Sequence, residues 1–163
     1  MQRKGKRMTS IASLPDAADK AFWWQGSLMT IRARAADTGG ALGLVEGIFY
    51  QGFGPPLHIH HHEDEGMLVL DGEIRFRQGS EEFIAGPGTL VWVPREVPHA
   101  FKVTSPSARA LVIVTPGGFE QMFVEGGVPA RDKPEPPTQS YDPEAARALA
   151  AKFGFDVVGP QLA

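Results

Sequence analysis

Four of the chain's five histidines lie in one short stretch, GPPLHIHHHEDE, at residues 54–65. His58 and His60 are separated by a single residue within an apolar frame, and on a β-strand two such residues project from the same face. Their imidazoles can therefore converge on one point. The fifth histidine, His99, lies far downstream in VPREVPHAF, where it begins the strand-like run HAFKV.

A carboxylate follows the histidine pair at Glu65. On an unbroken strand Glu65 would point away from His60, so the chain must bend through the polar residues 61–64 before this carboxylate can reach the same point. His61 and His62 fall in that bend. A run of histidines followed by acids is often only a hydrated loop, and this is the alternative interpretation of the bend.

Three neutral imidazoles and one carboxylate would suit a divalent transition metal ion, namely iron, nickel, manganese, cobalt, copper or zinc. Four such ligands leave one or two positions open on a metal that prefers five or six. An open cationic centre favours the binding of an enolate, a phenolate or dioxygen. The residues leave the identity of the metal open.

The 163-residue chain has no cysteine, which excludes disulfides, zinc–thiolate sites and thiol catalysis. Its formal net charge of -3 suggests neither a nucleic-acid partner nor an anionic membrane. No apolar run approaches the roughly eighteen residues of a membrane span. The basic start, MQRKGKR, is not followed by the apolar region of a secretory signal. We therefore expect a cytoplasmic protein with no nucleic-acid or membrane partner.

Short strands explain most of the remaining pattern. The 19 glycines and 14 prolines imply many turns, and apolar runs recur with turn residues about every eight to twelve positions between Ser27 and Thr115. Asp71-Gly72, between two such runs, predicts a β-hairpin. No long helical pattern interrupts the series, so the sequence predicts an all-β sandwich or barrel.

Four segments follow from these patterns: a disordered basic tail at 1–10, a β domain at 11–128, a proline-rich linker at 129–141, and a C-terminal helix and tail at 142–163. The last helix has Asp142 as its N-cap, Pro143 in its first turn and Gly154 at its end. PGGFEQMFVEGG predicts a further short helix with one apolar face.

The spacing of the candidate ligands resembles the cupin family. Its first motif, G-x5-H-x-H-x(3,4)-E-x6-G, is matched by Gly52, His58, His60, Glu65 and Gly72. Of the second, G-x5-P-x-G-x2-H-x3-N, the chain keeps Gly88, Pro94 and His99. Glu96 stands where that motif has a glycine, and Val103 where it has an asparagine. The stretches TPGGFEQMF and GFDVVGP are more narrowly similar to single-domain cupins related to quercetin 2,3-dioxygenase.

The resemblance implies a single antiparallel jelly-roll β-barrel with short C-terminal helices. One divalent transition metal ion per chain would lie in the barrel mouth, held by His58, His60, Glu65 and His99. A pocket for a small-molecule substrate would be lined by Phe53, Met67, Phe101 and Phe119, for which plain core packing is the alternative role.

The same resemblance implies a dioxygenase that acts on a flavonol-like or other enolisable substrate and releases carbon monoxide. Glu65 would be its catalytic residue, taking the proton of the substrate hydroxyl. Two alternatives stay open: a non-oxygenase isomerase or lyase, and a non-enzymatic small-molecule-binding cupin. Because cupins are commonly dimeric, we expect a homodimer, with Trp23 and Trp24 either in its interface or in the core.

Overall fold

The computed structural model describes residues 20–131, 133–138 and 142–163. The predicted basic tail at residues 1–10 lies outside these ranges, and so do the first residues of the predicted β domain. The division into four segments stays a prediction. Within the described ranges, no helix is long and apolar enough to cross a membrane.

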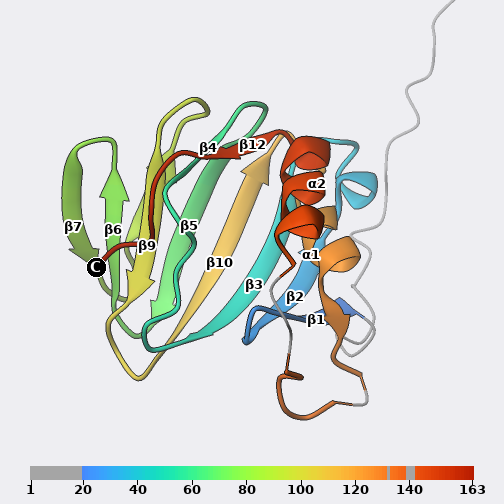
Figure 1. Ribbon diagram of the computed structural model, residues 1–163, viewed down its shortest axis with the longest axis horizontal. Helices are drawn as coiled ribbons and strands as arrows, with labels where there is room; N and C mark the ends of the chain where they lie inside the picture. The colour runs from blue at the N-terminus through green and yellow to red at the C-terminus, as the bar shows by residue number, and fades with distance from the viewer. Residues whose placement is uncertain (1–19, 132, 139–141) are drawn as a thin grey trace, which may run out of the picture.

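A seven-stranded antiparallel sheet carries the longest strands (Figure 1). Within it, the longest strand, β10, is hydrogen-bonded to β3 on one side and to β5 on the other. In spatial order the strands are β11 (Val128–Pro129), β1 (Ala21–Trp24), β2 (Ser27–Ala33), β3 (Gly43–Tyr50), β10 (Ser107–Thr115), β5 (Asp64–Asp71) and β8 (Leu90–Val93).

A five-stranded antiparallel sheet completes the β structure. In spatial order its strands are β12 (Phe155–Val157), β4 (His58–His60), β9 (His99–Val103), β6 (Ile74–Gln78) and β7 (Glu81–Ala85). The protein is therefore mostly β and is built from two antiparallel sheets. This arrangement is consistent with the predicted jelly roll.

The predicted hairpin at Asp71-Gly72 is wrong. These residues link β5 of the larger sheet to β6 of the smaller sheet, and the two strands are not paired. Both hydrogen-bonding edges of β5 are already taken by β10 and β8. Gly72 is needed there for a different reason: its backbone has φ +80°, and a Cβ would collide with the backbone of Ser107.

The core lies on one face of each sheet. Along β10 every second side chain is buried, which is the alternation of a strand with one covered face. Val45, Val69 and Val112 from the larger sheet join Ile74 and Val103 from the smaller one in a single apolar cluster. Burying one such side chain contributes about 1.5–3 kcal/mol, so this cluster is what holds the two sheets together.

Trp23 belongs to the interior of a single chain. Its side chain is buried, and its indole Nε1 donates a hydrogen bond to the carbonyl of Lys133 at 2.9 Å. Trp24 is only half-buried and packs edge-on against Phe123, with the ring centroids 5.8 Å apart. Of the two roles considered for this pair, core burial therefore describes Trp23.

The helices are short and lie beside β1, β2 and β3, at the opposite end from the β6–β7 hairpin (Figure 1). They are a 3-10 turn (Ala35–Asp37), α1 (Gln121–Gly126) and α2 (Pro143–Phe153). The predicted caps of α2 are confirmed. The Asp142 carboxylate accepts from the backbone N–H of Glu144 and Ala145, and Gly154 ends the helix at φ +66°. After Gly154 the chain continues directly into β12, which pairs with β4.

Candidate metal centre

Three strands from the two sheets bring the predicted ligands together. His58 and His60 occupy both ends of β4, and His58 is the direct antiparallel partner of His99 at the start of β9. Glu65 comes from the other sheet, near the start of β5, opposite the inward-facing Val93 and Val114. The site therefore depends on the packing of one sheet against the other.

One ligand atom from each of His58, His60, Glu65 and His99 lies within 4.8 Å of every other. Nε2 of His60 is 3.0 Å from the Glu65 carboxylate oxygen Oε2, and Nε2 of His99 is 3.4 Å from that same oxygen. The His58 and His99 ring centroids are 4.3 Å apart. Only 2% of His60 and 6% of His99 is exposed. The four side chains thus form one compact, largely water-excluded cluster.

Two of the imidazoles are held in a fixed orientation by backbone carbonyls. Nδ1 of His58 donates to the carbonyl of Pro56 at 2.8 Å, and Nδ1 of His99 donates to the carbonyl of Val97 at 2.9 Å. A carbonyl can only accept, so the proton of each ring lies on Nδ1 and the lone pair of the neutral ring lies on Nε2. Such an outer hydrogen bond is what orients a histidine that ligates a metal.

Electrostatics place these groups in distinct protonation states. Burial is the main cause that lowers the pKa of His58 to about 4, and the neighbouring imidazole of His99 lowers it further. Burial alone would raise the pKa of the Glu65 carboxyl, but His60 and His99 hold it well below its ordinary value. Near neutral pH, His58 is therefore neutral and Glu65 ionised, which are the forms that bind metal.

His60 differs from its neighbours. Burial would lower its pKa, but the carboxylates of Glu63 and Glu65 on either side of the ring raise that pKa to about 9. In the absence of a metal the ring carries a proton that a bound cation would displace. The donor set of three imidazole nitrogens and one carboxylate fits a divalent transition metal ion.

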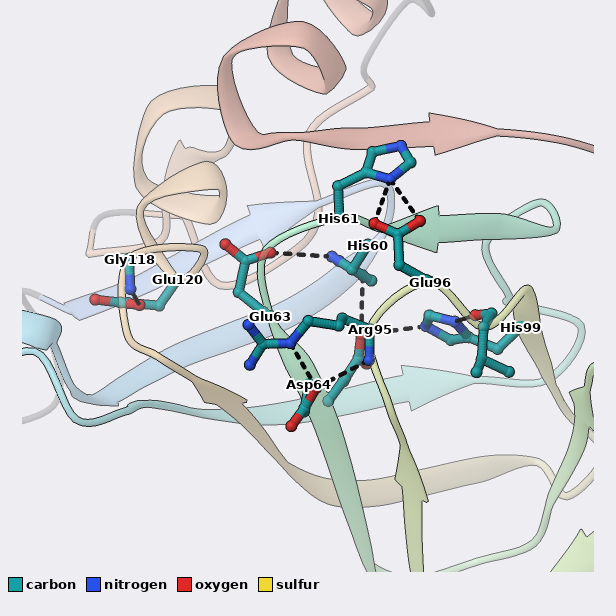
Figure 2. Close-up of polar contacts among 11 residues, drawn as sticks. His60, His61, Glu63, Asp64, Arg95, Glu96, His99, Gly118 and Glu120 are labelled. Carbon is teal, nitrogen blue, oxygen red and sulfur yellow. Dashed lines mark hydrogen bonds and ion pairs between the residues drawn. The ribbon is translucent and has the colours of Figure 1, made fainter.

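The remaining histidines of the stretch lie outside the cluster. His61 is bound between two acids of its own: Nδ1 is 3.0 Å from Glu96 (Figure 2), and Nε2 is 2.9 Å from Asp156. These contacts, that with Asp156 first, raise the pKa of His61. The ring of His62 packs against Gly154 at the end of α2. Both residues fall in the bend between β4 and β5, as predicted.

Glu96 explains one departure from the second cupin motif. It stands where that motif has a glycine and keeps a left-handed backbone with φ +66°, which strains a residue that carries a Cβ. Its backbone N–H donates to the carbonyl of His60 at 2.8 Å, while its carboxylate contacts His61. These contacts tie the loop before β9 to the end of β4.

A cavity of about 1400 Å³ opens beside the cluster and is lined by His58, His60 and Glu65. All four residues predicted for the substrate pocket, Phe53, Met67, Phe101 and Phe119, lie in its wall. Phe119 packs edge-on against His60 with the ring centroids 4.4 Å apart, and Phe49 stacks on Phe53 at 5.4 Å. The wall next to the cluster is therefore mainly aromatic.

Sequence reasoning missed the contribution of the C-terminal segment to this wall. Phe155 of β12 pairs with His60 of β4, and its ring centroid is 6.1 Å from that of His60. Leu149 and Arg147 of α2 also line the cavity. In the sequence, only the DVV run in GFDVVGP indicates a strand here. No residue near it identifies β4 as the strand with which it pairs.

Comparisons with known proteins agree with this geometry. Residues 48–116 match the family model described as "Cupin domain". Quercetin 2,3-dioxygenase of Bacillus subtilis (strain 168) is 26% identical over 129 residues, which are 79% of this chain and 38% of that protein. Quercetin 2,3-dioxygenase of Aspergillus japonicus is 29% identical over 85 residues, 49% of this chain and 24% of that protein. The chain thus spans well under half the length of these curated relatives.

Solved structures show the same fold at low identity. KdgF from Halomonas sp. superposes with a TM-score of 0.54 at 20% identity, covering 58% of this chain and 84% of that one. Oxalate decarboxylase from Bacillus subtilis superposes with a TM-score of 0.52 at 21% identity, covering 60% of this chain and 27% of that one.

Proposed function

We propose that this chain, a cupin that resembles quercetin dioxygenase-like proteins and matches the cupin domain at residues 48–116, is a metal-dependent dioxygenase. Its substrate would be a flavonol-like or other enolisable small molecule, bound at a 3-His-1-Glu centre. The observation that carries the proposal is the convergence of four ligand atoms within 4.8 Å at the wall of an aromatic cavity.

His58, His60, Glu65 and His99 would hold one divalent transition metal ion. When bound, such an ion acts as a Lewis acid, which lowers the pKa of a coordinated substrate hydroxyl and leaves positions open for dioxygen. Glu65 is the group that would accept the hydroxyl proton. Its pKa lies well below the ordinary value, so it is ionised near neutral pH, and it lines the cavity from which substrate arrives.

The aromatic wall supports a flat, largely apolar substrate. Phe49 and Phe53 are stacked with only 10° between their planes and offer a face on which an aromatic ring can lie. The rings of Phe119 and Phe155 contact that of His60, with centroids 4.4 Å and 6.1 Å away, so an aromatic ring bound beside them would lie near the ligand cluster. Apolar walls with a few convergent polar groups are typical of small-molecule sites.

Oxygen uptake tests the proposed reaction most simply. Tag-free protein reconstituted with each candidate metal is mixed with quercetin in an oxygen electrode, and carbon monoxide is measured in the headspace. We expect uptake of dioxygen that the Glu65→Gln variant abolishes and the His62→Ala variant keeps. Turnover without oxygen would replace the proposal with an isomerase or lyase. Tight ligand binding without any turnover would replace it with a binding function.

The proposal includes a homodimer, and its only support is that cupins are commonly dimeric. Sedimentation equilibrium at several protein concentrations measures the mass directly. We expect twice the chain mass of 17.6 kDa, and a mass equal to one chain at all concentrations would contradict it.

A further inference from the structure

The three imidazoles of the cluster have different hydrogen-bonding partners at Nδ1, the ring nitrogen that points away from the cluster. For His58 and His99 that atom, Nδ1, donates to a backbone carbonyl two residues upstream in the sequence. For His60, Nδ1 faces the side chain of Glu63 instead, with 3.7 Å between Nδ1 and Oε2 (Figure 2). One ligand of the three is therefore backed by a carboxylate.

These two atoms have unsatisfied hydrogen-bonding capacity in the part of the chain that the structure describes. Among the described residues, Nδ1 of His60 and Oε2 of Glu63 are both buried and both without a hydrogen bond. Only 9% of Glu63 is exposed. A buried unpaired donor or acceptor costs about 1–3 kcal/mol, and more when it is charged. A polar bend alone does not explain why two buried, unpaired polar atoms face each other at this cost.

The surroundings leave Glu63 available to His60. The neighbouring guanidinium, that of Arg95, contacts Asp64 at 3.0 Å, and the backbone N–H of Arg95 donates to that carboxylate too. Arg95 thus makes its hydrogen bonds to Asp64, the residue after Glu63, while its charge also acts on Glu63. A shift of roughly 0.5–1 Å would bring Oε2 and Nδ1 into hydrogen-bond range.

We infer that Glu63 is a positioning residue of the metal centre: its carboxylate accepts a hydrogen bond from Nδ1–H of His60 when Nε2 of His60 binds the metal. The inference rests on the proposed metal site. A metal ion on Nε2 makes the Nδ1 proton more acidic, which strengthens its bond to a carboxylate. The carboxylate in turn makes His60 a stronger donor than His58 and His99, whose outer partners are neutral carbonyls.

A purely structural role for Glu63 predicts something different. If the residue only shapes the bend between β4 and β5, its removal lowers the stability of the metal-free protein and leaves the ligand field of a bound metal unchanged. Glu96, whose carboxylate contacts the half-buried His61 of the same bend, provides a matched control. It also contacts an imidazole, but that imidazole is not part of the cluster.

Cobalt(II) serves as the probe, because its visible absorption reports ligand strength and its affinity can be measured against a coloured chelator. The full, tag-free chain is compared with Glu63→Gln, Glu63→Ala and Glu96→Gln. We expect Glu63→Ala to weaken Co²⁺ binding by about 10–100-fold. Glu63→Gln, whose amide oxygen still accepts, should weaken it by less than about tenfold. Both should shift the Co²⁺ absorption bands, whereas Glu96→Gln should leave affinity and bands unchanged.

Wild-type affinity and bands in both Glu63 variants would overturn the inference, as would an equal loss in Glu96→Gln. If Glu63→Ala does not fold, the near-isosteric Glu63→Gln decides, and unchanged bands in that variant would overturn it. A wild-type chain that binds no Co²⁺ would instead overturn the metal site itself. Co²⁺ binding with the expected variant pattern but without oxygen uptake would overturn only the proposed reaction.

Discussion

Two carboxylates on neighbouring parts of the larger sheet are surrounded in opposite ways. Glu46 of β3 and Glu65 of β5 both lie on strands that pair with β10, but Glu46 lies across from Leu111 and Glu65 across from Val114, on the other face. Glu46 is bound by two arginines, at 2.6 Å from Arg32 and 2.5 Å from Arg109. Glu65 is surrounded by imidazoles.

The two clusters differ in the charge and the lone pairs of the side chains around the carboxylate. Arginine is always charged and has no lone pair to offer, so the Glu46 cluster is complete within the chain. A neutral imidazole brings a lone pair and no charge, so the Glu65 cluster gathers donor atoms around one negative charge. The first arrangement stabilises a surface; the second suits the capture of a cation. Perturbing each cluster should therefore give separable results.

The largest effect is expected at the imidazole cluster. His99→Ala, or equally His58→Ala, leaves three ligands and should lower metal affinity by more than the roughly 10–100-fold that an outer residue costs. Competition with a chelator measures this change. Stoichiometric, tightly bound metal in the His99→Ala variant would show that the ligand set is wrong.

At the arginine cluster we expect a loss of stability without a loss of metal. Glu46→Gln removes the charge that both guanidiniums contact and should lower the free energy of unfolding by about 1–2 kcal/mol, because the arginines are half exposed to solvent. Chemical denaturation measures it. The metal content of Glu46→Gln should equal that of the wild type, and a parallel fall in both would mean that the two clusters are coupled.

The same variant has a predicted pH dependence. Burial would raise the pKa of Glu46, but the hydrogen bonds from Arg109 and Arg32 lower it below its ordinary value of 4.5. A carboxyl whose pKa is depressed by folding stabilises the fold fully above the unfolded pKa and loses that stabilisation as the pH falls through the folded pKa. The stability difference between wild type and Glu46→Gln should therefore be constant above pH 5.5 or so and shrink below about pH 4. A difference that grows on acidification would contradict the assignment.

The smallest effect is expected for His62→Ala. His62 lies in the same histidine run as the ligands, but its ring packs against Gly154 and not into the cluster. Metal content should stay at the wild-type level when measured by elemental analysis. Loss of metal in this variant would mean that the histidines of the bend, rather than those of β4, carry the site.

Local sequence rules predicted the parts of the site that depend on local geometry. The spacing of His58 and His60 on one strand face and the bend before Glu65 are both seen in the structure. The caps of α2 were predictable for the same reason, since a cap is formed by residues a few positions apart.

The misses involve partners that are distant in sequence. Asp71-Gly72 looks like a hairpin turn, and only the pairing of β5 with β10 and β8 shows that the chain changes sheets there. Phe155 reaches the site because β12 pairs with β4, a contact between segments almost one hundred residues apart. Glu63 was grouped with the polar bend, because its burial beside His60 depends on the packing of both sheets.

Metal analysis of the wild-type chain, purified without a histidine tag and without added metal, tests the central claim most directly. A tag would add histidines of its own and obscure the count. We predict about one transition metal ion per chain by elemental analysis, retained through dialysis and lost on addition of a strong chelator. A chain that holds no metal as purified, and that takes up none after incubation with each of the six candidate ions, would contradict the account.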